Sequence, residues 1–203
     1  LYDCDGFDKD CSVRRTGIGY MPEQVRWEGR ISVKNALNSI ALMRNNPVDI
    51  EKIIKTVGLS SKSNDYLDNL SQGMRQRLSL ACALIGDPKI LIMDEPLNGL
   101  DPLAQRAFCN LLKQLAANGV AIVISSHQVS DLEHLVDEIA LMHHGQLLIK
   151  DSMENVREQL GLGEDSDLVE MICSVTGINP EDVSLEVAQD NLLPFKKIGG
   201  EEE

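Results

Sequence analysis

The sequence predicts an α/β domain built on a parallel β-sheet, and two observations support this prediction. Short, continuous apolar runs occur at residues 90–93 and 120–124, and each is too short for a helix. Between them, residues 102–118 have the periodicity of a helix with one apolar face. A strand, a helix and a second strand in this order are typical of a parallel sheet with helices packed on it.

The same alternation extends in both directions along the chain. After the second apolar run, Ser130 and Glu133 form a capping box, which predicts a helix that reaches residue 139. A hairpin is then expected to join residues 139–142 to residues 147–149. The other predicted elements are a strand at residues 17–20, helices at residues 32–44, 49–57 and 74–85, and a short helix at residues 168–175.

Composition limits the kinds of protein that the chain can be. No apolar run approaches the roughly 18 residues of a membrane-spanning helix. The five cysteines are odd in number and lack CxxC spacing, which argues against a disulfide framework or a zinc site. The net charge of −13 is concentrated in residues 151–203, which hold 14 acidic and three basic residues. Because the rest of the chain is near neutral, we expect no nucleic-acid partner.

The ends of the two apolar runs place polar groups at one edge of the predicted sheet, where ligands bind in such folds. Asp94 and Glu95 follow the first run, and Ser125, Ser126 and His127 follow the second. Adjacent carboxylates suit phosphoryl chemistry, because one can hold Mg²⁺ while the other activates or positions a water. From these residues alone, a strand that simply ends in a polar turn remains the alternative.

A second candidate site precedes the helix expected at residues 74–85. Ser71, Gln72 and Gly73 offer a hydroxyl, unhindered backbone N–H groups and a helix N-terminus, which together can bind an anion. The same residues also suit an ordinary serine-capped helix. Both interpretations stay open on this segment alone.

Three motifs, in their order and spacing, resemble those of the nucleotide-binding domain of ATP-binding cassette (ABC) transporters. "LSQGMRQRL" is similar to the signature motif, "ILIMDEPLNGLDP" to the Walker B motif and D-loop, and "ISSH" to the switch-histidine segment. Upstream, "IGYMPEQVRWEGRISVKNAL" resembles the Q-loop and the start of the family's helical subdomain. The resemblance implies a P-loop NTPase-like, three-layer domain with a parallel sheet core and an inserted helical subdomain.

The resemblance also implies roles for residues near the ends of the strands. Asp94 would hold Mg²⁺ through its hydration shell, and Glu95 would be the general base for the attacking water. His127 would contact the γ-phosphate of ATP, and Asp101 would belong to the loop that couples the two sites of a dimer.

Further roles follow for the signature and Q-loop segments. Ser71, Gln72 and Gly73 would contact ATP that is held by a partner subunit. Glu23 falls at the Q-loop position, where many family members have glutamine, and Gln24 lies beside it. A carboxylate at this position can approach Mg²⁺ but cannot donate a hydrogen bond.

The Walker A loop, G-x-x-x-x-G-K-[ST], does not occur in residues 1–203, because none of the 15 glycines is followed by lysine. We therefore expect the chain to lack about 40 to 60 N-terminal residues of the cassette. Residues 1–150 would form a partial ABC ATPase domain, with a helical subdomain inserted at about residues 29–75, and residues 151–203 an acidic C-terminal extension. The incomplete sheet is expected to expose apolar surface and an unpaired strand edge.

The predicted function is that of the ATP-binding and ATP-hydrolysing subunit of an ABC transporter of the bacterial exporter type, with ATP and Mg²⁺ as cofactors. The implied partners are a transmembrane permease and a second ABC ATPase subunit, in a head-to-tail homodimer or heterodimer. The implied location is cytoplasmic, at the inner face of the cell membrane. Two alternatives are a non-catalytic module that supplies only the signature half-site, and an ABC ATPase without a transport role.

Overall fold

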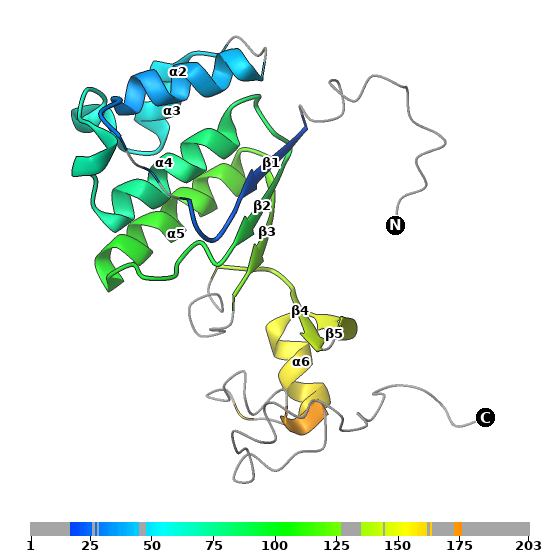
Figure 1. Ribbon diagram of the computed structural model, residues 1–203. Coiled ribbons are helices and arrows are strands. Elements are labelled where there is room, and N and C mark those ends of the chain that lie inside the picture. Colours follow the sequence, from blue (N-terminus) through cyan, green and yellow to red (C-terminus); the bar gives the residue numbers. More distant parts are fainter. Residues whose placement is uncertain are drawn as a thin grey trace. The chain divides into compact units, whose positions relative to one another are not determined.

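The computed structural model describes residues 17–25, 27, 29–44, 48–126, 135–143, 145–161, 163 and 173–175. The chain divides into two compact units, Leu1–Ser126 and His127–Glu203, and each is described by itself. Figure 1 shows the first unit as a sheet with helices packed on one side, and the second as a hairpin followed by a helix.

The first unit is built around a parallel sheet, as the apolar runs predict. Its described strands are β1 (Ile18–Met21), β2 (Ile90–Asp94) and β3 (Ala121–Ser125), in the order β1-β2-β3. β2 lies in the middle and pairs in parallel with both neighbours, so that Asp94 lies opposite Ser125. Parallel pairing brings the carboxyl ends of these strands to one edge of the sheet.

Two helices cover one face of this sheet. α4 (Gln72–Leu84) begins after the capping residue Ser71, and α5 (Pro102–Ala117) has a proline in its first turn. α4 passes so close to β1 that a Cβ atom on Gly19 would lie 2.3 Å from the carbonyl oxygen of Ala83. Glycine therefore lets the strand and helix backbones approach. The core includes the fully buried side chains of Met21, Leu78, Leu80, Leu91, Met93, Phe108 and Leu112.

A group of short helices lies between β1 and α4 in the sequence. It consists of α2 (Val33–Met43), α3 (Ile50–Thr56) and the 3₁₀ helices η2 (Ser60–Lys62) and η3 (Leu67–Asn69). Ser32 caps α2 and Asp49 caps α3, because each side-chain oxygen accepts a hydrogen bond from a first-turn backbone N–H. Both α-helices lie where the apolar spacing predicts them.

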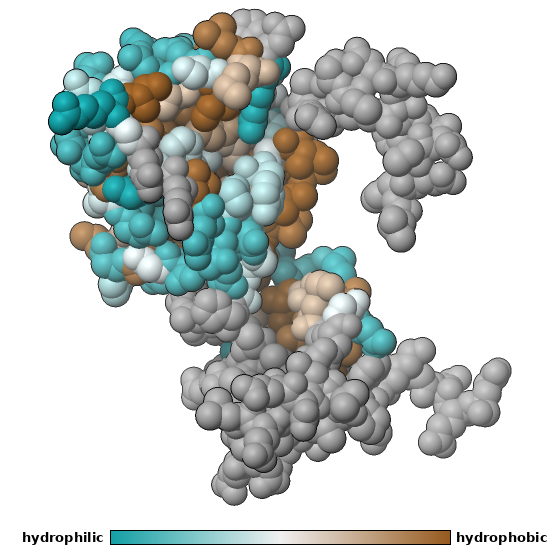
Figure 2. All heavy atoms as spheres, in the orientation of Figure 1, coloured by the Kyte–Doolittle hydropathy of each residue, from teal (hydrophilic) through white to brown (hydrophobic). Residues whose placement is uncertain are grey.

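The face of the sheet opposite α4 and α5 is apolar and exposed. Ile90 and Ile92 of β2 are each 39% exposed and Val123 of β3 is 57% exposed, whereas Leu91 and Met93 are buried. Figure 2 shows hydrophobic residues gathered over these strands. A continuous apolar run such as residues 90–93 predicts a parallel strand buried on both faces. This prediction is wrong for β2, because the described helices cover only one face. The exposed apolar surface itself agrees with the sequence-based expectation.

The second unit contains an antiparallel hairpin and the helix α6 (Met153–Leu160). β4 (Ile139–His143) pairs with β5 (Gln146–Asp151), and Gly145 in the turn between them has a φ of +75°. The predicted hairpin is thus confirmed. Among the described residues of this unit, the buried side chains are those of Leu141, Ile149, Val156, Cys173 and Val175.

The helix that is predicted to reach residue 139 is not present at residues 135–138. Residues 135–138 are not helical and β4 starts at Ile139, so the predicted helix does not extend through these positions. Its capping box at Ser130 and Glu133 lies outside the described residues, and of the short helix expected at residues 168–175 only residues 173–175 are described, as helical. In the described parts of the chain, no helix combines the length and the apolar character needed to cross a bilayer.

Candidate functional site

The carboxyl end of β2 places Asp94 beside Ser125 of the neighbouring strand. The Ser125 hydroxyl donates a hydrogen bond to Asp94 Oδ1 at 2.5 Å. The same hydroxyl oxygen accepts a hydrogen bond from the backbone N–H of Glu95 at 3.0 Å, and the Ser125 carbonyl oxygen lies 3.2 Å from that nitrogen. Ser125 therefore orients the Asp94 carboxylate and the Glu95 backbone together.

Glu95 has a backbone conformation that is rare for a residue with a side chain, with a φ of +44°. This left-handed conformation costs a non-glycine residue on the order of 1 kcal/mol. The hydrogen bonds from its N–H to Ser125 help to hold it. Such strain is concentrated at functional sites, where the surrounding structure over-determines the backbone. The conformation of Glu95 agrees with a role at this position, although Asp87, between α4 and β2, has a similar φ of +51°.

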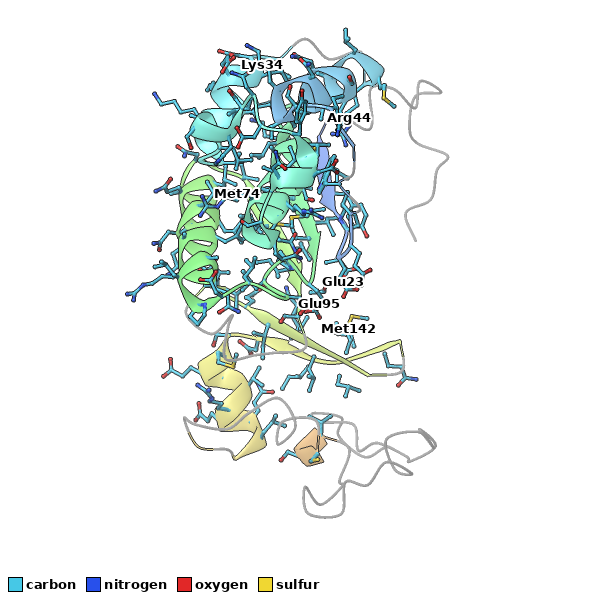
Figure 3. All side chains as sticks on the ribbon, turned by 60° about the vertical axis from the view of Figure 1, so that its left-hand side comes forward. Glu23, Lys34, Arg44, Met74, Glu95 and Met142 are labelled. Carbon is cyan, nitrogen blue, oxygen red and sulfur yellow. The ribbon has the colours of Figure 1, made fainter. Side chains whose placement is uncertain are left out.

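The loop after β1 brings a third carboxylate to the same edge of the sheet. Glu23 Oε1 accepts a hydrogen bond from Asn98 Nδ2 at 3.5 Å, which is a long contact between exposed side chains. Figure 3 shows Glu23 and Glu95 at the same end of the sheet. Gln24 is exposed. The structure thus places Glu23, Asp94 and Glu95 at one edge.

The start of α4 carries the second candidate site. Ser71 Oγ accepts a long hydrogen bond of 3.4 Å from the Met74 N–H, and the side chains of Ser71 and Gln72 are exposed. Gly73 lies against the start of α5, where a Cβ atom on it would lie 3.4 Å from Ala104 Cβ. Ser71 is thus a helix cap, which agrees with the simpler of its two interpretations. Its contact with an anion stays a prediction.

The segment between β2 and α5 runs beside this helix start. Gly99 has a φ of +72°, and a Cβ atom on it would lie 3.9 Å from Gln72 Cγ. Asp101 Oδ1 accepts hydrogen bonds from the N–H groups of Leu103 at 3.0 Å and Ala104 at 2.9 Å. Asp101 therefore caps α5, and its predicted role between two subunits is not placed by these contacts.

The carboxylate oxygens at the sheet edge suit a metal ion whose other positions are filled by water and phosphate oxygens. His127 lies outside the described residues, so its predicted phosphate contact is not placed. Among the residues that are described, no three His, Cys, Asp or Glu side chains form a metal-binding group. Mg²⁺ usually takes one or two carboxylates and fills its other positions with water and phosphate oxygens. Asp94, oriented by Ser125, satisfies that requirement.

Two residues at the edge were not assigned contacts from the sequence. The sequence predicts Ser125 at the same edge as Asp94, but not their hydrogen bond. The bond depends on the parallel register of β2 and β3, which places the two residues opposite each other. Asn98 has no comparable local signal, because its contact with Glu23 joins residues 75 positions apart.

A parallel sheet with carboxylates at its carboxyl edge is an arrangement that nucleotide-binding α/β domains use, because ligands bind at the carboxyl ends of the strands. Residues 3–98 match the protein family described as "ABC transporter". This part of the chain is therefore similar to the ATP-binding domain of ABC transporters, as its motifs indicate.

Similar proteins agree with this assignment. The uncharacterized ABC transporter ATP-binding protein YhcH of Bacillus subtilis is 41% identical over 111 residues, which are 54% of this chain and 35% of YhcH. The bacitracin transport ATP-binding protein BcrA of Enterococcus faecalis is 41% identical over 100 residues, which are 49% of this chain and 32% of BcrA. This chain thus spans about a third of the length of both relatives.

The fold is also found in solved structures. One described as the structure of the ATP binding subunit of an ABC transporter has a TM-score of 0.65 and 26% identity to this chain. The match covers 79% of this chain and 69% of that chain. The predicted α/β fold class is thereby confirmed.

Proposed function

We propose that the chain is the ATP-binding subunit of an ABC transporter of the exporter type, which hydrolyses ATP and drives a partner permease. The family supports ATP hydrolysis in general, and the name of BcrA, which refers to bacitracin transport, supports a transport role. A permease, a second ATPase subunit bound head to tail and a position at the inner face of the cell membrane are parts of this proposal.

The observation that carries the proposal is the joint orientation of Asp94 and Glu95 by Ser125. Asp94 would hold Mg²⁺ through water, and the ion would offset charge on the β- and γ-phosphate oxygens. Glu95 would accept a proton from the attacking water, and His127 would contact the γ-phosphate. Glu23 could approach Mg²⁺ or accept a hydrogen bond from its water, but it cannot donate a hydrogen bond.

The start of α4 would serve the ATP of the second subunit. Its exposed N-terminus combines backbone N–H groups with the positive end of the helix dipole. Gly73 carries no side chain that would keep a phosphate away from these groups, and Ser71 and Gln72 are exposed beside it. Asp101, on the neighbouring segment, would lie near the same subunit boundary.

The test measures binding and hydrolysis of Mg-ATP by the full chain. Glu95→Gln should leave binding intact and reduce hydrolysis by about 10²- to 10⁴-fold, the usual contribution of a general base. Glu51→Gln, an exposed carboxylate on α3 that pairs with Lys34, is the control and should change neither quantity. If the unaltered chain hydrolyses Mg-ATP, equal hydrolysis by Glu95→Gln would disprove the assigned role of Glu95. No hydrolysis by the unaltered chain would disprove hydrolysis by residues 1–203, which contain no Walker A loop.

A second candidate function is that of a signature module, favoured by the exposure of Ser71 and Gln72 at the start of α4. In this case the chain binds no ATP alone but completes the site of an intact partner. The chain is mixed with an intact ABC relative whose own signature serine is replaced. Rescue of the relative's ATPase activity by the unaltered chain, and not by Ser71→Arg, would support the module. ATP binding by the isolated chain would contradict it.

A further inference from the structure

Trp27, the single tryptophan of the chain, joins the loop that carries Glu23 to the helix that follows Ser71. The Trp27 indole N–H donates a hydrogen bond to Ser79 Oγ at 2.9 Å, across 52 positions of sequence. Ser79 lies on α4 and is only 5% exposed. Burying a hydroxyl group without a hydrogen-bond partner costs free energy, so this contact stabilises the packing of Trp27 on α4.

The Glu23 loop is anchored at both ends. Met21, two residues before Glu23, is fully buried and pairs with Met93 of the central strand. Four residues after Glu23, the indole of Trp27 is bound to Ser79. The loop can therefore shift little unless either β1 or α4 shifts with it.

A second pair of contacts joins the continuation of this loop to the segment that precedes α4. The Gly29 N–H donates a hydrogen bond to Asp68 Oδ1 at 2.7 Å, and the Leu67 N–H donates one to the Ile31 carbonyl at 3.1 Å. The segment of Leu67 and Asp68 runs directly into Ser71. The loop thus contacts the chain both before and after the start of α4.

We propose that Trp27 is a positioning residue that makes the Glu23 loop and the start of α4 move as one body. This inference rests on the proposed function, because both segments belong to the proposed nucleotide sites. Indole suits the task, since it combines an N–H donor with a large, rigid apolar body. Ser79 lies seven residues after Gln72, or about two helical turns, so a rigid helix transmits its displacement to the signature residues.

Hydrogen exchange of the full chain tests the mechanical link. Ser79→Ala should raise amide exchange about fivefold, the effect of one net hydrogen bond, in residues 23–25 and also in residues 71–75. Trp27→Phe keeps the apolar body without the donor and should produce the same pattern. The double variant should be no worse than either single variant, because both remove one interaction.

The matched control is Ser39→Ala. The Ser39 hydroxyl donates a hydrogen bond at 2.9 Å to the Asn35 carbonyl of its own helix, so its loss should leave both segments unchanged. The proposal is overturned if exchange in Ser79→Ala rises only next to residue 79, or rises equally over the whole chain. If Ser79→Ala fails to fold, Trp27→Phe decides the question by the same readout.

A nucleotide measurement separates this inference from the proposed function. ATP affinity is measured for the full chain, alone and mixed with the intact ABC relative whose signature serine is replaced. If the unaltered chain neither binds ATP nor raises binding in the mixture, the proposed function fails, while the exchange data still decide the link. If the unaltered chain binds ATP or raises binding in the mixture, Ser79→Ala should weaken the apparent ATP affinity about fivefold. An unchanged ATP affinity would refute the positioning role.

Discussion

Glu95 combines a proposed catalytic carboxylate with a strained backbone, so its chemistry and its cost to stability can be separated by substitution. Its φ of +44° is one that asparagine tolerates and that glutamine, like glutamate, does not favour. Glu95→Asn should therefore have a free energy of unfolding about 0.5 to 1 kcal/mol above that of Glu95→Gln. Both variants lose the carboxylate, and both should lose hydrolysis.

Urea unfolding followed by Trp27 fluorescence measures this difference, because the tryptophan lies in the same unit as Glu95. Equal stability of the two variants would show that the left-handed conformation carries no strain. The result would also test the proposed site, because backbone strain at a residue such as Glu95 is expected where function requires it.

At the level of elements, the close packing of α4 on β1 depends on one glycine. A Cβ atom at Gly19 would lie 2.3 Å from Ala83 O and 2.6 Å from Leu91 Cδ2, so the strand and the helix must separate to accept it. Gly19→Ala should lower the free energy of unfolding by about 1 to 3 kcal/mol, the usual cost of overpacking. Gly17→Ala is the control, because nothing lies within 4 Å of its Cβ position. A Gly19→Ala chain as stable as Gly17→Ala would contradict this packing.

The junction between β5 and α6 is stabilised by the carboxylate of Asp151. This carboxylate accepts hydrogen bonds from Asn155 Nδ2 and the Ser152 N–H, each at 2.7 Å, and from Gln159 Nε2 at 3.2 Å. The hydrogen bonds from Asn155 and Ser152 favour the charged form and lower the pKa of Asp151 below its ordinary value of 3.8.

The pH dependence follows from the direction of this shift. Since the unfolded chain binds the proton more readily, the stabilisation is complete above the ordinary pKa of 3.8 and is lost as the pH falls through the lower folded value. Asp151→Asn should therefore destabilise the second unit near neutral pH and match the unaltered chain in strong acid. Urea unfolding followed by circular dichroism across this range checks the trend. The prediction fails if the difference between Asp151→Asn and the unaltered chain is the same at neutral pH and in strong acid.

For the molecule as a whole, the exposed apolar face of the first unit should govern how the isolated chain behaves in solution. Ile92 and Val123 present apolar side chains to water on neighbouring strands, and such a continuous patch promotes association. Ile92→Thr with Val123→Thr should reduce association at micromolar concentration, because threonine keeps the strand preference and adds a polar group.

Light scattering during purification measures this association. The control replaces Leu42 and Met43 by threonine, since these residues are 80% and 83% exposed on α2, away from the sheet. A monodisperse, unaltered chain, or an equal effect of the two double variants, would show that the sheet face does not drive association.

The elements and most of the candidate site could be predicted from the sequence because their signals are local. Apolar periodicity, the caps at Ser32, Ser71 and Asp101 and the glycines that end helices all act within a few residues of the structures that they specify. The end of an apolar strand likewise placed Asp94 and Glu95 at the sheet edge. These signals led to the α/β fold and to the family.

Contacts between distant segments had no such signal. The bonds from Ser125 to Asp94 and from Trp27 to Ser79 depend on strand register and on the packing of α4, which no short window of sequence encodes. For the same reason the sequence could not tell whether one face or both faces of β2 are covered, because its apolar run is compatible with either. Local chemistry determines which elements form, whereas the neighbours that long-range packing supplies determine which of their side chains meet.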